Sequence, residues 1–207
     1  MSRAPSAKAF RADAILNRVR ILDAARGEFA QHGMRAEISR IANAAGVATG
    51  TIYRHFTSKD GLATAVIHEL AERFTQDLAR ALESPDPVEA LATLIRRGFD
   101  LLDAYGELLV MVLASPPGTY ARGRADYDTL RAQLGELLQR GVDRGEFRAD
   151  LNVDYAVAVF GGLFTPRALP RLRASQPLDA IAEASVGFFL AGVGSSRIPA
   201  APAAEQP

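Results

Sequence analysis

Apolar residues recur along most of this 207-residue chain at the spacing of three to four that marks one face of a helix. In the first helix that we predict, residues 13–32, the positions at this spacing are Ile15, Val19, Leu22 and Phe29. A half-buried strand would instead alternate apolar and polar residues, and the sequence has no sustained run of that kind. The pattern therefore predicts an all-α protein.

Proline and glycine mark where the remaining helices end, because an interior proline removes a hydrogen bond and clashes with the preceding turn. Between Pro5 and Pro85 the chain has no proline. Residues 1–12 and 194–207 have little to bury, and we expect both segments to be disordered. We expect about nine helices, and after the first they span residues 39–45, 49–56, 58–82, 88–105, 107–115, 120–144, 152–165 and 178–193.

Two of the expected helices, residues 39–45 and 49–56, have only about two turns each and must be stabilised by their neighbours. Gly46 joins them and adopts a positive φ at little cost. Ser58 is the expected N-cap of the long helix that follows. The side chains that we expect to build a shared core are Ile41, Val47, Ile52 and Phe56, with Leu22, Ala25 and Phe29 of the first helix. This arrangement is a helix-turn-helix.

The outward face of the second short helix carries hydroxyl, aromatic and basic groups and no acidic group. Its residues are Thr49, Gly50, Thr51, Tyr53, Arg54 and His55. Such a face suits the major groove of DNA, which admits one helix and presents donors and acceptors on the base edges. Arg54 and Thr49 are the candidates for reading bases. The candidates for phosphate contacts are the hydroxyls of Thr49, Thr51 and Tyr53, the His55 ring and the Lys59 ammonium, and Arg40 completes the predicted DNA-binding set.

Residues 38–62, ISRIANAAGVATGTIYRHFTSKDGL, resemble the DNA-binding domain of the TetR family of transcriptional regulators. The pieces I-A-x-x-A-G-V, G-T-[ILV]-Y-x-H-F and S-K-x-x-L occur together, in order and in register, and the match covers about residues 21–67. The resemblance implies that Thr49, Gly50 and Thr51 face the groove and that Tyr53, His55 and Lys59 face phosphates.

The sequence departs from this family at two places. Ala36 and Glu37 stand where most members have a Thr or Ser near the start of the second helix. Ala48 stands where Ser is common. The first departure bears on the N-cap of the second helix, and the second removes one expected phosphate hydroxyl.

The resemblance also implies an organisation and a function. Residues 13–60 would form the helix-turn-helix DNA-binding domain, and residues 61–193 a helical ligand-binding and dimerisation domain. The protein would be a repressor that binds a palindromic operator as a homodimer. A small-molecule effector would move the helix at residues 58–82 and so release the DNA. A transcriptional activator, or a regulator that needs no ligand, is the alternative within the same fold.

The C-terminal residues are assigned on the same resemblance. Candidates for lining an effector pocket are Phe99, Met111, Tyr120, Tyr127, Phe160 and Phe164, with ordinary core packing as the alternative for each. Small and aromatic residues on the last two helices suit close contact with a second copy. Candidates for this dimer interface are Val157, Gly161, Phe164, Gly187, Phe188 and Ala191, with internal packing as the alternative.

The amino-acid composition argues against several other classes of function. The chain has no cysteine, which excludes disulfides, Cys-ligated zinc, iron–sulfur clusters and thiol nucleophiles. Its three histidines are scattered, and we find neither paired carboxylates nor a phosphate-binding glycine loop nor metal-ligand spacing. We therefore expect no enzyme, no cofactor and no metal site. A helical adaptor that binds only protein would leave residues 49–59 unexplained.

The N-terminal 60 residues and the rest of the chain carry opposite net charges. The 24 basic residues match the 24 acidic ones, a net charge of +0 that by itself argues against a nucleic-acid partner. Residues 1–60, however, hold ten basic and five acidic residues, a net charge of +5, which leaves −5 for the remainder. A basic N-terminal part suits DNA binding. No apolar run approaches the ~20 residues of a membrane span and none resembles a signal peptide, so we expect a soluble cytoplasmic protein.

Overall fold

The computed structural model describes the backbone of residues 7–113 and 121–195 and the side chains of residues 13–111 and 128–195. All regular elements within these ranges are helical, so the predicted all-α fold is confirmed. The elements are α1 (Ala7–His32), the 3-10 turn η1 (Gly33–Arg35), α2 (Ile38–Ala45), α3 (Thr49–His55), α4 (Lys59–Glu83), α5 (Pro87–Leu113), α6 (Ala121–Asp143), α7 (Val153–Leu163), α8 (Leu169–Arg173) and α9 (Leu178–Val193).

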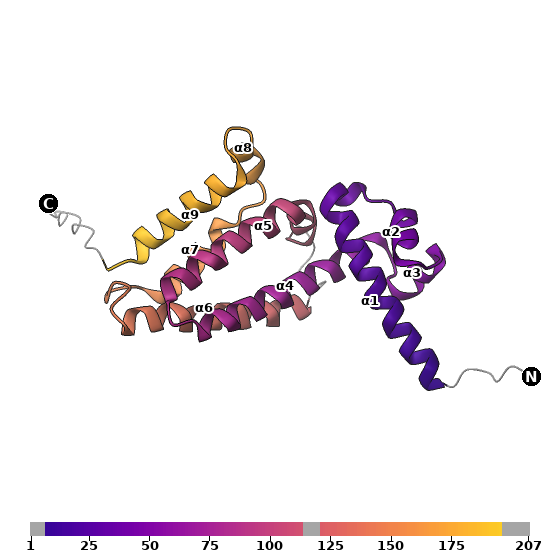
Figure 1. Ribbon diagram of the computed structural model, residues 1–207, viewed down its shortest axis with the longest axis horizontal. Coiled ribbons are helices and arrows are strands. Elements are labelled where there is room, and N and C mark those ends of the chain that lie inside the picture. The colour runs from indigo at the N-terminus through magenta and orange to yellow at the C-terminus, as the bar shows by residue number, and fades with distance from the viewer. Residues whose placement is uncertain (1–6, 114–120, 196–207) are drawn as a thin grey trace, which may run out of the picture.

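The helices form two bodies that share α4 and α5. Helices α1–α3 lie at one end of the molecule, and α6–α9 form the other end (Figure 1). Helix α4 leads from the first body into the second, where it packs along α5 and α6. We call α1–α3 with the first turns of α4 the N-terminal domain, and the rest the C-terminal bundle.

Each body has its own hydrophobic core. The N-terminal core gathers Phe29 of α1, Ile41 of α2, Ile52 of α3 and Leu62 of α4. It also takes in Tyr105 and Leu108 near the end of α5. The bundle core is formed by α4–α7 and α9, and its buried side chains include Leu78, Leu91, Ile95, Leu137, Phe160 and Phe189. Helix α5 therefore contributes to both cores.

Helix α1 differs from the prediction in its start and in its buried face. It begins at Ala7, so residues 7–12 of the segment expected to be disordered are helical. Ile15 and Val19, expected on the inner face, are 67% and 58% exposed. The buried residues are Ile21, Ala25 and Phe29. Apolar residues on α1 form two overlapping stripes, and only the stripe that faces α2 and α4 is covered.

Other boundaries agree closely, with three differences. The two helices expected at residues 88–105 and 107–115 are one helix, α5, bent at Tyr105, where φ is −129° and ψ is 15°. Helix α8, five residues long, lies between residues 165 and 178, where we predicted no helix. Gly194, expected in the disordered tail, pairs with Phe147 in an isolated bridge, and residues 196–207 lie outside the described part of the chain.

Candidate nucleic-acid interface

The turn between α2 and α3 sets the angle of the two short helices. Gly46 has a φ of 66°, in the left-handed region that glycine adopts without steric cost. Its N–H donates to the Asn43 carbonyl at 3.2 Å, and the Val47 N–H donates to the Ala42 carbonyl at 3.0 Å. These bonds cap the C-terminus of α2 and direct the chain toward α3. The predicted role of Gly46 is therefore confirmed.

The helix N-termini reflect the departures from the family motif. Neither Glu37 before α2 nor Ala48 before α3 provides a side-chain cap. Ala36 is instead buried in the N-terminal core. Ser58, by contrast, caps α4 as predicted, because its Oγ accepts a hydrogen bond from the Gly61 N–H at 2.9 Å. The α2–α3 pair is thus held by core packing rather than by caps.

Helix α3 presents a polar face above a buried apolar side. Ile52 and Phe56 point into the N-terminal core. The opposite side, which we call the α3 face, consists of the exposed Thr49, Gly50, Tyr53 and Arg54 and the half-buried Thr51 and His55. Within it, Arg54 Nη2 donates to Thr51 Oγ1 at 3.0 Å. Six of the eight predicted DNA-binding residues are therefore brought together on one short helix.

The other two predicted residues, Arg40 and Lys59, are engaged elsewhere in the N-terminal domain. Arg40 on α2 places its Nε 3.3 Å from Glu28 Oε2. Lys59, at the start of α4, donates from Nζ to the backbone carbonyl of Met34 in η1. Both cations thus have partners within the chain, and their contact with phosphates stays a prediction.

Arg18 is a basic residue near this surface that the sequence analysis missed. Its guanidinium carbon lies 4.6 Å from the centroid of the Phe56 ring, directly after α3, in a cation–π arrangement. The residue belongs to the exposed first half of α1, where helical periodicity carries no sign of a contact 38 positions away. Arg18 therefore places a further positive charge beside α3.

An apolar cavity of about 270 Å³ lies between α4, α5, α6 and α7. Of the six residues predicted for a pocket, Phe160 and Phe164 line it, and Phe99 packs behind with its ring centroid 5.4 Å from that of Phe164. Met111 packs against the N-terminal core instead. Tyr120 and the side chain of Tyr127 lie outside the described residues. The sequence analysis did not assign Leu70, Phe74, Leu101, Leu102, Leu109 and Leu130 to this cavity.

The last two long helices leave an apolar surface uncovered. Phe188 is 73% exposed, and Gly161, Gly187 and Ala191 are also exposed, as a dimer interface would need. The other predicted members lie elsewhere, because Val157 is buried in the bundle core and Phe164 lines the cavity, as does the exposed Gly161. Tyr155, which is 70% exposed, was missed. We call Tyr155, Gly187, Phe188 and Ala191 the outer face of α7 and α9.

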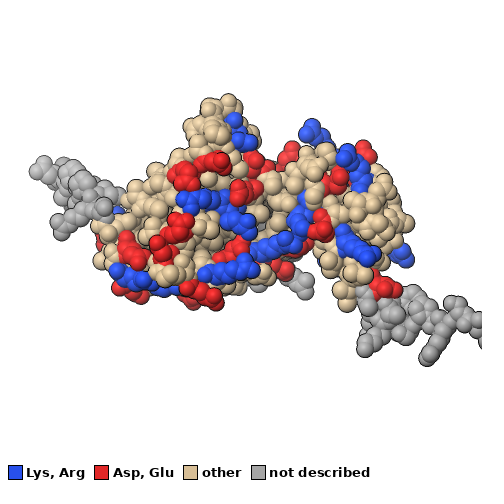
Figure 2. All heavy atoms as spheres, viewed as in Figure 1, with Lys and Arg blue, Asp and Glu red and all other residues tan. Residues whose placement is uncertain are grey.

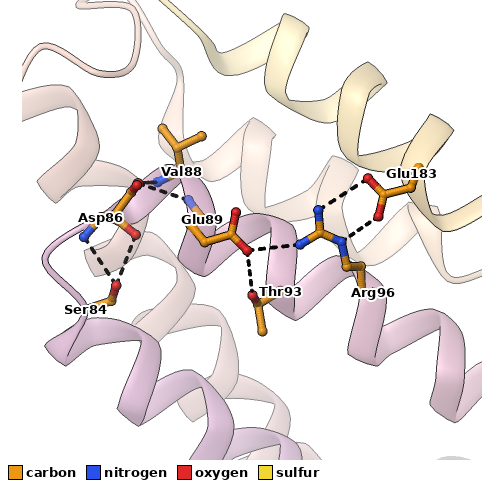
Figure 3. A network of polar contacts seen from close by, with 7 residues as sticks. All are labelled: Ser84, Asp86, Val88, Glu89, Thr93, Arg96 and Glu183. Carbon is orange, nitrogen blue, oxygen red and sulfur yellow. Dashed lines mark hydrogen bonds and ion pairs between the residues drawn. The ribbon is translucent and has the colours of Figure 1, made fainter. Parts of the chain in front are cut away.

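A polar network fastens α9 to α5 (Figure 3). Arg96 on α5 donates from Nε to Glu183 Oε1 at 2.6 Å and from Nη2 to Glu183 Oε2 at 3.3 Å, and it also reaches Glu89. The hydrogen bond between the two side chains lowers the pKa of the Glu183 carboxyl and raises the pKa of Arg96. Asp86 Oδ1 caps α5 by accepting from the Val88 and Glu89 amides. This network links α9 to α5 at the surface, while the buried residues of α9 pack in the bundle core.

The face of the bundle seen in Figure 2 carries charges of both signs. Acidic and basic side chains are interspersed over the helices of the bundle in the view of Figure 2. Among the described residues, no three His, Asp or Glu side chains gather as metal ligands would. No helix within the same ranges is long and apolar enough to cross a membrane.

Comparisons with known proteins extend the resemblance beyond the motif. Residues 21–66 match the family described as bacterial regulatory proteins, tetR family. The chain is 31% identical over 149 residues to the HTH-type transcriptional repressor KstR2 of Rhodococcus jostii (strain RHA1), covering 67% of this chain and 72% of the relative. It is 26% identical over 177 residues to the fatty acid metabolism regulator protein of Bacillus subtilis (strain 168), covering 79% of this chain and 88% of the relative.

A solved structure shows the same likeness over nearly the whole fold. The TetR transcription regulatory protein from Mycobacterium vanbaalenii is 29% identical and superimposes with a TM-score of 0.65, covering 89% of this chain and 99% of that chain. A helix-turn-helix alone is shared by many unrelated proteins, whereas these matches include the bundle. The chain belongs to the TetR family of bacterial transcriptional regulators.

Proposed function

We propose that this protein is an effector-responsive transcriptional repressor that binds a palindromic operator as a homodimer. The observation that carries the proposal is the α3 face, a polar and basic surface on a helix whose other side is fixed by Ile52 and Phe56. Residues 13–60 read the DNA, residues 61–193 bind effector and partner subunit, and the protein acts in the cytoplasm. The relative from R. jostii, named a repressor, supports the sign of regulation.

The α3 face enters the major groove in this proposal. Arg54 and Thr49 contact base edges, and Gly50 lets the helix approach closely. Thr51, Tyr53 and His55 contact the flanking phosphates. The bond from Arg54 to Thr51 Oγ1 holds the guanidinium along the helix surface until a base edge replaces the hydroxyl. One such base contact contributes about 1–3 kcal/mol of discrimination.

A second copy binds through the outer face of α7 and α9. Its apolar residues are exposed in the single chain, and their neighbours in α7 and α9 are packed in the bundle core. A two-fold pair uses the same surface twice and presents two recognition helices to successive major grooves, about 34 Å apart. This spacing explains why a dimer would recognise a palindrome.

The effector occupies the cavity between α4 and α7. None of the described residues that line the cavity is charged, and Tyr105 alone among them has a polar side-chain group. An uncharged, largely apolar molecule is therefore the class that fits, because burying a charge without a partner is costly. The relative from B. subtilis is named a fatty acid metabolism regulator, which supports an effector of lipid character.

Fluorescence anisotropy with a labelled fragment of the upstream intergenic DNA tests the proposal. The unmodified protein should bind with an affinity that falls steeply as salt rises. Arg54→Ala together with Tyr53→Ala should weaken binding at least about tenfold. Arg131→Ala is the matched control, since it removes an exposed arginine of α6 far from the α3 face. Equal affinity of the double variant and the control would refute the assigned interface.

A further inference from the structure

At the junction between the two domains, the backbone N–H and C=O of one residue, Met34, are each bound by a side chain from another helix. Met34, in the η1 turn between α1 and α2, donates its N–H to Glu107 Oε2 at 3.1 Å. Its carbonyl accepts a hydrogen bond from Lys59 Nζ at the start of α4. The two partners are 73 and 25 positions away in the sequence. The only turn that joins α1 to the helix-turn-helix is therefore fixed by both α4 and α5.

The neighbouring glycine makes this contact possible. Gly33 has a φ of +54°, and a Cβ added to it would overlap the Glu107 carboxylate. Any other residue at position 33 would be strained and would displace the carboxylate from the turn. Glycine at position 33 of η1 therefore leaves room for the Glu107 carboxylate, which comes from α5.

Glu107 lies on the part of α5 that also lines the cavity. Tyr105, the residue at the bend, lines the cavity and is part of the N-terminal core. Leu109 lines the cavity one turn further on. Glu107 lies between these two residues and faces η1. A change in the cavity that shifts the bend therefore shifts the carboxylate that holds Met34.

We propose that Glu107 is a positioning residue, which orients the helix-turn-helix relative to the bundle by holding the Met34 amide. The inference rests on the proposed function, because it assigns a route by which effector occupancy reaches the DNA-binding helices. The resemblance pointed to movement of α4 alone. Here α5 takes part as well, because Lys59 of α4 binds the Met34 carbonyl and Glu107 of α5 binds the Met34 N–H.

The geometry can be tested without DNA or effector. Because the chain has no cysteine, Asn43→Cys on α2 and Ala132→Cys on α6 allow two spin labels to be attached at exposed sites. Labelled protein is diluted into excess unlabelled protein, and double electron–electron resonance gives the distance distribution between the domains. Glu107→Ala should widen the distribution about twofold. Glu107→Gln should restore the narrow one, because its amide oxygen still accepts the hydrogen bond.

The matched control lies one turn earlier on the same helix. Asp103 pairs with Arg173 of α8 at 3.2 Å, a contact within the bundle. Asp103→Ala should leave the distribution narrow. An unchanged distribution in Glu107→Ala, or equal widening in Asp103→Ala, would overturn the assignment. Gly33→Ala displaces the same carboxylate and should reproduce the widening, so the test does not depend on one variant.

Two further measurements separate positioning from DNA contact. Hydrogen exchange of the Met34 amide should be about tenfold faster in Glu107→Ala and nearly unchanged in Glu107→Gln. Affinity for the upstream DNA should fall about fivefold in Glu107→Ala with the same salt slope as the parent, because no phosphate contact is removed. A reduced salt slope would make Glu107 part of the contact surface and contradict the inference. Absence of DNA binding by the parent protein would refute the proposed function. The spin-label distances would still test whether Glu107 orients the helix-turn-helix relative to the bundle.

Discussion

The two hydrophobic cores of this protein are built differently. In the N-terminal core, Ile21, Phe29 and Ile41 are completely buried around two short helices that cannot form alone. The bundle core borders a cavity of about 270 Å³, which Leu70 and Tyr105 of the N-terminal core also line, and it leaves an apolar outer face on α7 and α9. In the proposed function, the surface that binds DNA is supported by a filled core. The part proposed to bind effector and partner subunit keeps unfilled space at its border.

The largest expected effect is the loss of a ring from the filled core. Phe29→Ala should lower the free energy of unfolding by about 3–5 kcal/mol, because the packed surroundings cannot collapse into the space. Phe164→Ala, beside the existing cavity, should cost only about 1–2 kcal/mol, since that ring is partly exposed already. Urea denaturation followed by circular dichroism measures both values. Equal losses would remove the contrast between the cores.

The outer face of α7 and α9 gives the next effect. Phe188→Glu should place charges at the proposed two-fold contact and yield a monomer with affinity for the upstream DNA lowered at least about a hundredfold, because two linked half-sites are lost. Sedimentation velocity reports the assembly, and anisotropy reports the affinity. Leu172→Glu is the control, because this leucine is exposed on α8, outside the outer face. A Phe188→Glu variant that sediments like the parent would contradict the proposed interface.

A methyl group can fill the cavity from the side. A Cβ added at Gly98 would overlap the Phe164 ring, and both residues line the cavity. Gly98→Ala should destabilise by about 1–3 kcal/mol and abolish uptake of the apolar fluorophore N-phenyl-1-naphthylamine. Gly27→Ala on α1 meets open space and should stabilise by about 0.5–1 kcal/mol. Undiminished dye uptake in Gly98→Ala would place the dye elsewhere.

The smallest effect concerns the exposed pair between α5 and α9. The pKa of Glu183 is lowered by its hydrogen bond to Arg96, so the pair stabilises the fold above the usual carboxyl pKa. This contribution is lost as pH falls through the lowered pKa. Glu183→Gln should therefore melt slightly below the parent at pH 7, and the two melting curves should converge in acid. A difference that persists at pH 2 would show that the variant acts through packing instead.

Sequence reasoning was most successful where structure depends on neighbouring residues. The turn at Gly46, the cap at Ser58 and the burial of Ile52 beneath α3 all follow from local spacing and were predicted. The family motif lies in this same region, which is why the α3 face was assigned residue by residue. Its contacts with DNA stay a prediction.

Features that depend on distant contacts were not predictable from the sequence. The choice between two apolar stripes on α1 depends on which one α4 covers, and periodicity gives both equal weight. Tyr105 was expected at a helix end, whereas core packing on both sides continues α5 through a bend. Val157 is apolar like the exposed Phe188, and only the fold shows that it points inward. The contact of Glu107 with Met34 spans 73 positions and has no local signal.

The bend in α5 lets a small rotation at one residue displace the atoms on its two sides relative to each other. Arg96 links its first part to α9, the proposed partner-binding helix, and Glu107 contacts η1 of the N-terminal domain beyond the bend. Eight of the 27 residues of the helix follow the bend, a length of about 12 Å. A rotation of about 5° at Tyr105 would move a point about 20 Å away in the N-terminal domain by about 2 Å. Small angular changes at one residue would thus be amplified into shifts large enough to take a recognition helix out of step with the groove.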